Sequence, residues 1–486
     1  MPVLPTLTND AIAAYLTNGY WADTGGIRHS FPVSPGGTLT IDMSTVATAG
    51  RFLAVKALDA WTMISGINFS VTNIVGADIV FTDNIEYFNG LETNPYGGSA
   101  WYIPSGEAVD GFVNISTNWL LDYGTTLGDY SFSTYMHEIG HALGLGHAGN
   151  YDGTGLYATD GTGANTYLND SWQATLMSYF SPFENTSIAA NWDYFGAGAT
   201  PLMTPMVADI LAIWDLYGTP TTLRTGDTTY GVGSNAGGYY DTYLQPDTAF
   251  TIVDNGGIDK INFSNVIADQ RVTLTPESIS DVGGRVGNMI IMRGTIIEKF
   301  ISGAGNDDIT GNTADNTLWG GGGNDVIRGG FGLDIIRGGT GNDTLNGNRK
   351  HDLLIGEAGN DILRGGGGRD KLDGGAGDDR LEGGIGRDKL FGGTGADTFV
   401  FKAGWAVDRV SDFEDNIDTI ELNSALWLGT YGVLTVSQVI ATFGTSNVAN
   451  NGNAGTHVEL DFGAGDVLKI HGISNANLLL DDITII

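Results

Sequence analysis

A nine-residue repeat between residues 302 and 400 constrains the fold of this chain more than any other feature. The unit at 320–328 reads GGGGNDVIR, and the units that start at 329, 338, 365, 374, 383 and 392 keep its frame, G-G-x-G-x-D-x-U-x, where U is a large apolar residue. This frame is typical of a parallel β-roll. A flexible glycine-rich linker has no reason to keep strict phase over such a length. We therefore expect these residues to form a β-roll.

Each position of the repeat has a physical role. Glycine permits the left-handed turn conformations, and the apolar residue at position eight is expected to fill a thin core. The aspartate at position six and the turn carbonyls are the hard oxygen ligands that calcium prefers. Because so thin a core cannot hold the coil alone, calcium should supply folding energy. The predicted ligands are Asp307, Asp325, Asp334, Asp343, Asp352, Asp361, Asp370, Asp379, Asp388 and Asp397.

Two units depart from the frame. The unit at 311 has Asn316 at position six, and the unit at 347 has Lys350 in place of a glycine. We expect weak or missing calcium ions beside these two. Residues 401–486 alternate apolar and polar side chains, which predicts strands that cap the roll.

A second informative segment, His137–His147, reads HEIGHALGLGH. His137 and His141 are four residues apart, so on a helix they share one face and can hold one metal ion. Gly144 allows the helix to end in a sharp turn that returns His147 as a third ligand. Three neutral imidazoles leave zinc one open position, which is typical of a catalytic site. Glu138 would then act as the general base.

A methionine follows this motif at a spacing that supports its interpretation as a zinc site. Residues 175–180 read TLMSYF. In metzincins, zinc peptidases with this extended histidine motif, a methionine turn lies beneath the metal. We expect Met177 to take that place, because its flexible side chain fills irregular gaps.

Composition excludes several classes of protein. A length of 486 residues indicates two or three domains. There is no cysteine, so neither disulfides nor a thiol switch is available. A net charge of -34 argues against a nucleic-acid partner and an anionic membrane surface. No N-terminal secretion signal is evident, and no apolar run approaches the ~20 residues that a membrane span needs.

Local patterns predict an α+β catalytic domain at 1–218 and an all-β domain at 219–486 that contains the repeats. Helices are expected at 48–65 and 205–217, and strands at 77–82 and 99–103. The zinc-binding helix should begin near Ser131 or Ser133, both plausible caps.

With these motifs in one chain, the sequence resembles the serralysins, secreted bacterial metzincin metalloproteases with C-terminal RTX repeats. Further segments carry the resemblance: LYG at 216–218, RTGDT at 224–228, DNGGID at 254–259 and GNTADN at 311–316. The implied fold is a metzincin domain followed by a parallel β-roll with a β-sandwich-like C-terminal cap.

The resemblance also implies roles for single residues. Tyr179 would ligate zinc at rest and donate a hydrogen bond to the oxyanion in the transition state. The strand Ala100, Trp101 and Tyr102 would bind a peptide as an added antiparallel strand. A further calcium site joining the domains would use Arg224, Gly226, Thr228, Asp254, Gly256, Gly257, Asp259 and Glu298.

The C-terminal residues Asp482–Ile486 resemble the acidic and then hydrophobic end that type I secretion machinery reads. We therefore expect a secreted, extracellular protein that folds where calcium is abundant. We also expect a monomer, with protein or peptide substrates and no nucleic-acid partner.

These observations predict a secreted zinc-dependent endopeptidase stabilised by calcium. The main alternative is a non-catalytic, calcium-dependent adhesin or surface-binding protein with a structural zinc site. Calcium repeats alone do not separate the two, whereas an open zinc position beside Glu138 favours the enzyme. Another metzincin branch, such as a matrixin, is disfavoured by the missing cysteine switch, by Tyr179 and by the β-roll.

Overall fold

The computed structural model describes residues 4–83, 96–102, 107–149, 157–158, 164–180, 185, 200–445, 457–473 and 475–486. The chain packs as two compact units. The first comprises Met1–Gly257 and Pro276–Thr295, and the second comprises Ile258–Thr275 and Ile296–Ile486. Residues 219–257 thus pack with the first unit, while the functional boundary drawn at 218 stays a prediction.

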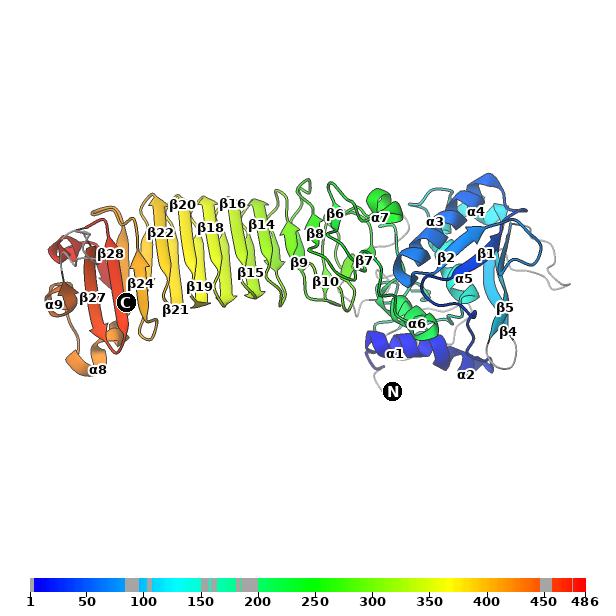
Figure 1. Cartoon of the computed structure of the whole chain (residues 1–486), viewed down its shortest axis with the longest axis horizontal. Helices are drawn as coiled ribbons and strands as arrows, with labels where there is room; N and C mark the ends of the chain where they lie inside the picture. The colour runs from blue at the N-terminus through cyan, green and yellow to red at the C-terminus, as the bar shows by residue number, and fades with distance from the viewer. Residues whose placement is uncertain are drawn as a thin grey trace. The chain divides into compact units, whose positions relative to one another are not determined.

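The first unit is built from helices and short strands (Figure 1). Its helices are α1 (Asn9–Ala14), the π-helix η1 (Tyr15–Gly19), α2 (Tyr20–Thr24), α3 (Thr48–Ser65), α4 (Thr117–Tyr123), α5 (Tyr130–Ala142), α6 (Val207–Tyr217) and α7 (Gly238–Tyr243). Its strands are β1 (Thr38–Asp42), β2 (Asn68–Val71), β3 (Ile79–Thr82), β4 (Tyr96–Tyr102), β5 (Ala108–Ile115), β6 (Thr229–Gly231), β7 (Phe250–Ile252), β10 (Ile279–Ser280) and β11 (Met289–Ile291).

The main sheet of this unit has the order β2-β1-β3-β5-β4. Its first four strands are parallel, and β4 pairs antiparallel with β5 at the edge. A second, small sheet has the order β10-β11-β7. Helix α5 packs against α3 and against β4 and β5. The buried stripe of α3 holds Leu53, Ala57 and Ile64, as its apolar spacing predicts.

The start of α5 differs from the sequence-based expectation. The helix begins at Tyr130 with Asp129 as its N-cap residue, two residues before Ser131 and four before Ser133, the serines we expected to cap it. The Asp129 carboxylate is used within the preceding turn, where it accepts the backbone N–H of Thr126 at 2.7 Å. Ser133 lies inside the helix, and its hydroxyl donates to the carbonyl of Tyr130 at 2.8 Å. A serine hydroxyl can thus find a backbone hydrogen-bond partner within a helix as readily as at its start.

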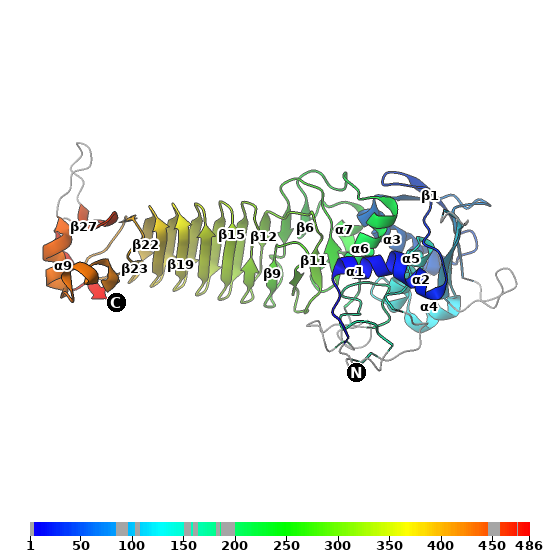
Figure 2. The same cartoon turned by 90° about the horizontal axis from the view of Figure 1, so that it is seen from below.

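The second unit is a ladder of parallel strands, coloured green to orange in Figure 1 and seen from below in Figure 2. Successive repeats place their strands alternately in two sheets. One sheet contains β8 (Lys260–Asn262), β12 (Lys299–Ile301), β14 (Thr317–Gly322), β16 (Ile335–Thr340), β18 (Leu353–Ala358), β20 (Lys371–Ala376) and β22 (Lys389–Thr394). The other contains β9 (Arg271–Thr273), β13 (Asp308–Thr310), β15 (Val326–Phe331), β17 (Thr344–Arg349), β19 (Ile362–Gly368), β21 (Arg380–Gly386) and β23 (Thr398–Phe401).

The register between coils is eighteen residues, or two repeats: Ile309 pairs with Ile327, and Leu318 pairs with Ile336. These four position-eight side chains are fully buried, as the repeat predicts. Two sheets of parallel strands, each with one row of buried apolar side chains, fit a β-roll, and this confirms the coarse fold expected for the repeats.

Beyond the repeats, strands continue both sheets of the roll. Strands β24 (Val407–Val410), β26 (Gly444–Thr445), β27 (His457–Gly463) and β28 (Asp466–His471) extend one sheet, and β25 (Thr419–Leu422) and β29 (Ile483–Ile485) extend the other. Helical elements that the sequence pattern did not predict accompany them: η2 (Ser424–Leu426), α8 (Leu428–Tyr431), α9 (Val436–Phe443) and η3 (Ala476–Leu480). Across the described residues of both units, no helix combines the length and apolarity needed to cross a membrane.

Candidate metal centre

The histidines of the motif meet at the end of α5. His137 and His141 lie one turn apart on this helix, which ends where Gly144 adopts a φ of +105°. A side chain at Gly144 would meet the carbonyl of His29 at 2.3 Å, so both backbone shape and space require glycine. The turn returns His147 to the helix, where its Nε2 lies 3.0 Å from Nε2 of His141. One ligand atom from each of the three histidines falls within 4.8 Å of the others.

Backbone carbonyls fix the orientation of the two helical imidazoles. Nδ1 of His137 lies 2.8 Å from the carbonyl of Leu176, and Nδ1 of His141 lies 2.8 Å from that of Leu145. A carbonyl only accepts, so each Nδ1 carries the proton and each Nε2 presents a lone pair. Burial lowers the pKa of His137 to about 4 and, with the neighbouring His137, that of His141 to about 3. Neutral imidazoles with free lone pairs are what a zinc ion needs.

Met177 lies directly against the helix that carries the ligands. Its side chain is fully buried, and a Cβ added to Gly140 would meet its sulfur at 2.8 Å. The Met177 carbonyl also accepts the N–H of Ala148, the residue after the third histidine, at 3.2 Å. The turn around Met177 therefore touches both ends of the histidine motif.

A buried carboxylate that sequence reasoning missed holds this turn in place. Asp209, at the start of α6, accepts the backbone N–H of Leu176 at 2.8 Å and the hydroxyl of Thr175. It also accepts the N–H of Met206 at 2.9 Å, which caps its own helix. Burial raises the pKa of Asp209 to about 7. The sequence does show an acidic residue in the first turn of an apolar helix. Such a residue is usually explained as an ordinary helix cap, so it did not indicate a role beside the histidines.

The N-terminal helices support the third histidine. The Leu16 carbonyl, within η1, accepts the N–H of Gly146 at 2.8 Å, and the Trp21 indole donates to the Gly144 carbonyl at 3.0 Å. The Tyr20 ring lies edge-on to His147 with 5.3 Å between ring centroids. A side chain at Gly146 would meet the Tyr20 ring at 2.2 Å, so this glycine permits the close approach. No local pattern in the sequence links residues this far apart.

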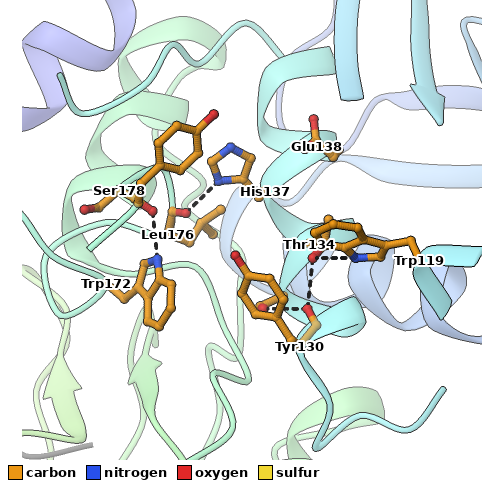
Figure 3. A pocket seen from close by; sticks show the side chains of 10 residues that line it. Trp119, Tyr130, Thr134, His137, Glu138, Trp172, Leu176 and Ser178 are labelled. Carbon is orange, nitrogen blue, oxygen red and sulfur yellow. Dashed lines mark hydrogen bonds between the residues drawn. The ribbon is translucent and has the colours of Figure 1, made fainter. Parts of the chain in front are cut away.

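A cavity of about 160 Å³ opens beside His137. Figure 3 shows His137 and Glu138 projecting from α5, with Trp172 on one side and Trp119 on the other. Glu138 is only 4% exposed and faces this space. The remaining lining consists of aromatic rings, hydroxyls and one leucine: Trp119, Tyr130, Ser133, Thr134, Trp172, Leu176, Ser178 and Tyr179. Helical spacing back from His137 points to Tyr130, Ser133 and Thr134, a signal that sequence reasoning did not use.

Tyr179 also reaches the histidines. Its hydroxyl lies 2.8 Å from Nε2 of His147, and its ring stacks near that of His137 at 5.8 Å between centroids. A metal ion held by the three imidazoles would therefore lie within reach of the Tyr179 hydroxyl.

The expected substrate strand lies at the edge of the main sheet. Ala100, Trp101 and Tyr102 belong to β4, whose backbone pairs with β5 on one side. Among the described strands of this sheet, none pairs with the other side of β4. The side chains of these three residues lie outside the described part of the chain.

In the β-roll, one oxygen of each position-six aspartate is already used. Oδ1 of Asp343, for example, accepts the N–H of Asp325 at 2.8 Å, one coil back. Its Oδ2 is buried with no partner among the described residues. A Cβ added at Gly338 would lie 2.2 Å from this Oδ2 and 2.9 Å from the Gly356 carbonyl oxygen. Oxygens thus converge where a cation fits. The aspartates with such a partnerless Oδ2 are Asp325, Asp334, Asp343, Asp352, Asp361, Asp370, Asp379 and Asp388.

The ends of the repeat and the degenerate units differ. Oδ2 of Asp307 accepts the hydroxyl of Ser302, whereas Asp397 keeps the ladder contact, because its Oδ1 accepts the N–H of Asp379 at 2.9 Å. Asn316 keeps one side of the ladder, since its N–H donates to Oδ1 of Asp334 at 2.8 Å. Its Oδ1, however, accepts the N–H of Asn312 within its own unit, and its amide nitrogen lies 3.3 Å from the carbonyl of Ile297. An N–H₂ group in place of an oxygen cannot bind calcium. The weaker calcium sites expected at this unit and at Lys350 stay a prediction.

The remaining predicted calcium ligands fall in both units. In the first, the loops at 224–228 and 254–257 meet, because a Cβ on Gly257 would lie 2.5 Å from the Gly226 carbonyl carbon. Asp254 there accepts the hydroxyl of Tyr230 at 2.6 Å, and Thr228 donates to the Gly226 carbonyl at 2.8 Å. Arg224 and Gly256 belong to the same two loops. In the second unit, Glu298 accepts the N–H of Asp259 at 2.6 Å.

Comparison with known proteins agrees with the motifs. Residues 219–452 match the family described as Peptidase M10 serralysin C terminal. A serralysin from Proteus mirabilis is 39% identical over 54% of this chain and 54% of its own length. A serralysin from Photorhabdus laumondii is 34% identical over 57% of this chain and 56% of that protein. The metallopeptidase AprA from Pseudomonas marginalis is 36% identical over 54% of each chain.

The resemblance to serralysins is confirmed. The chain spans about half the length of these relatives. The match alone therefore does not assign the activity of the whole relatives to this chain. The extracellular lipase LipA from Serratia marcescens covers 49% of this chain, but its TM-score of 0.18 has no bearing on the fold.

Proposed function

We propose that this chain is a secreted zinc-dependent endopeptidase of the serralysin type, with a metzincin catalytic domain at 1–218 and a calcium-stabilised roll at 219–486. One observation carries the proposal: three imidazoles converge, and one of them, His137, lines the wall of a cavity together with Glu138. Serralysins and a metallopeptidase among the relatives support the same reaction class.

His137, His141 and His147 would hold the zinc ion through their Nε2 atoms. When bound, zinc supplies a Lewis acid that polarises the scissile carbonyl and acidifies the attacking water. Glu138 would accept the proton of that water and return it to the leaving amine, so the base is regenerated in each cycle. The Tyr179 hydroxyl would leave His147 and donate to the developing oxyanion.

The position of β4 supports an extended peptide as substrate. A strand that pairs on one side only offers a row of backbone donors and acceptors to a peptide laid antiparallel along it. Ala100, Trp101 and Tyr102 would hold the substrate in this way, so that its scissile bond lies at the histidines. Backbone recognition of this kind is compatible with many side chains and therefore with general protein substrates.

Calcium would order the roll through the partnerless aspartate oxygens, and through the loops that contain Arg224 and Asp254. Export by type I secretion machinery, read from Asp482–Ile486, would deliver a loosely ordered chain to a medium where calcium is plentiful. We propose a monomer in that medium.

The non-catalytic adhesin with a structural zinc site is not favoured. A structural site has four protein ligands and is closed, whereas three histidines converge here and one of them, His137, lines a cavity together with Glu138. The relatives found are named as serralysins and metallopeptidases.

A direct test is casein hydrolysis by the purified full chain in constant calcium, with and without o-phenanthroline. The chelator should abolish hydrolysis, and added zinc should restore it. Hydrolysis that persists in the metal-free protein would contradict the proposal, and so would a zinc-loaded protein that leaves casein intact.

A further inference from the structure

The two turn edges of the β-roll have different chemistry, although the same repeat builds both. Position five on one edge carries neutral or acidic side chains whose oxygens accept the backbone N–H of the next coil at 2.7–3.0 Å. These residues are Asn306, Asn324, Asn342, Asn360 and Asp378. On the opposite edge the same position reads Asp315, Leu333, His351, Arg369 and Arg387. The second edge therefore becomes cationic toward the C-terminal end of the repeats.

The cationic edge continues onto the neighbouring sheet. Two residues after Arg369 and Arg387, at position seven, come Lys371 and Lys389, which pair in register on β20 and β22. Lys389 in turn pairs with Arg409 on β24. Figure 1 shows these three strands side by side. We call the five residues Arg369, Lys371, Arg387, Lys389 and Arg409 the cationic ladder.

Most of the ladder is exposed and not neutralised. Arg369, Arg387, Lys389 and Arg409 are exposed, and within the described parts of the chain no carboxylate lies at ion-pair distance from any of them. Lys371 is paired with Asp373 at 3.1 Å. Like charges opposite one another on neighbouring strands destabilise a sheet. A chain with 56 acidic and 22 basic residues has ample carboxylates to avoid this arrangement.

Several other cations of the roll are paired. Arg337 lies 2.9 Å from Glu357, Arg364 lies 3.8 Å from Glu382, and Arg380 lies 2.8 Å from Glu421. The exposed cations of the ladder differ from these paired cations. The ladder offers unmet positive charge to an outside partner.

The geometry of the ladder selects among anionic partners. Its charges recur once per coil, at a spacing of about 4.8 Å between neighbouring strands. Such a regular, narrow row matches a linear polymer with regularly repeated charge better than the irregular surface of a folded protein. A broad anionic membrane would also face the rest of a molecule with a net charge of -34. Single-stranded nucleic acid needs free aromatic rings for its bases, whereas the Phe391 ring is covered by the Lys371 ammonium at 4.9 Å.

We propose that the cationic ladder is a binding site for a linear acidic polysaccharide, a sugar chain that bears carboxylates. The site does not involve the histidines or the cavity beside them. It would retain the secreted chain on an acidic glycan, with each carboxylate contacting one or two exposed cations. Binding through exposed charges should weaken steeply with salt.

The test measures binding of the full chain to immobilised polyglucuronate at constant calcium, with neutral dextran as the blank. The triple variant R369Q/R387Q/K389Q removes three ladder charges. The matched control R337Q/R364Q/R380Q removes three paired cations from the same roll, so the net charge changes equally. Calcium-dependent thermal melting of each variant shows whether the roll remains folded.

We expect the ladder variant to lose about tenfold or more in affinity, while the control stays within about twofold and high salt weakens the wild-type protein. Equal loss in both variants, or binding of the wild-type protein that ignores salt, would overturn the proposal. Tighter binding to anionic phospholipid vesicles or to single-stranded DNA than to polyglucuronate would also overturn it, by assigning the ladder to a different partner. If the ladder variant fails to fold, the single exposed substitutions R387Q and K389Q repeat the comparison.

Discussion

The candidate metal centre and the β-roll both gather cation ligands, but they hold them in different ways. At the centre, the helical imidazoles are fixed by backbone carbonyls, at 2.8 Å from His137 to Leu176 and from His141 to Leu145. In the roll, each inner aspartate leaves Oδ2 buried without a partner among the described residues. A ligand held by protein hydrogen bonds survives without its ion, whereas a buried carboxylate without a partner is unstable. The first site is thus built to use a metal, and the second needs one to fold.

Calcium removal should separate the two regions most strongly. In excess chelator selective for calcium, we expect the second unit to lose its ordered strands while α3 and α5 of the first unit keep theirs. Each calcium ion present at about 100 times its Kd contributes about 2.7 kcal/mol, so several ions together exceed the stability of a small domain. Hydrogen exchange of the two units, with and without calcium, measures this. Equal protection of the roll in both conditions would contradict the comparison.

Glu138→Ala should show that the first site performs chemistry. Loss of a general base lowers turnover by about 10²–10⁴-fold. Because Glu138 is not one of the proposed zinc ligands, the zinc content should stay at one ion per chain. Metal analysis measures this content, and peptide hydrolysis measures the turnover. Glu138→Gln is the matched control, since it preserves shape. Wild-type turnover in either variant would remove Glu138 from the mechanism.

The pH dependence of the calcium-free roll sharpens the comparison. Burial raises the pKa of Asp325, Asp343 and Asp379 from 3.8 to about 7. The folded carboxyl groups thus hold their protons more tightly than the unfolded ones. Their contribution to the stability of the calcium-free roll is present below pH 4 and is lost as the pH rises toward 7.

Calcium affinity should rise over the same pH window, because binding displaces these protons. Calorimetry in buffers of different ionisation enthalpy would detect the released protons. Calcium binding without proton release at pH 6 would contradict the assigned ligands.

Asp209→Ala should have a moderate effect confined to the first unit. The backbone N–H groups of Leu176 and Met206 would lose their acceptor, at about 1–3 kcal/mol for each buried unsatisfied donor. Zinc affinity should fall, because the turn that carries Leu176 and Met177 orients His137. Chemical denaturation followed by first-unit tryptophan fluorescence measures the change. Asp209→Asn keeps one acceptor and should lose less, and a shift of the roll transition instead would be inconsistent with this role.

The smallest predicted effect lies in the degenerate repeat. Lys350 has a φ of +77°, in the left-handed region that side chains disfavour. Lys350→Gly should stabilise the calcium-loaded roll by about 0.5–1 kcal/mol. Asn348 has a φ of +76° but belongs to a residue type that tolerates this region better, so Asn348→Gly should gain less. Destabilisation by Lys350→Gly in thermal melting would assign the lysine a contact of its own.

How much the sequence predicted follows from the same difference between the regions. The roll was predictable to the residue, since its period fixes both register and burial, as Ile309 and Leu318 show. The histidines were predictable because their ligand spacing is local. The Asp209 support and the contact of Tyr20 with His147 were not, because each joins residues far apart in the sequence. The start of α5 was misplaced because a serine hydroxyl can also donate a hydrogen bond to a backbone carbonyl inside a helix.

The central claim is that three imidazoles hold one zinc ion beside Glu138. Zinc-edge anomalous diffraction from crystals of the full chain, with metal analysis of the same preparation, tests it most directly. The account predicts one zinc per chain, within bonding distance of Nε2 of His137, His141 and His147, and its loss in His147→Ala. A chain that hydrolyses casein with no zinc at these atoms, or with zinc bound elsewhere, would contradict it.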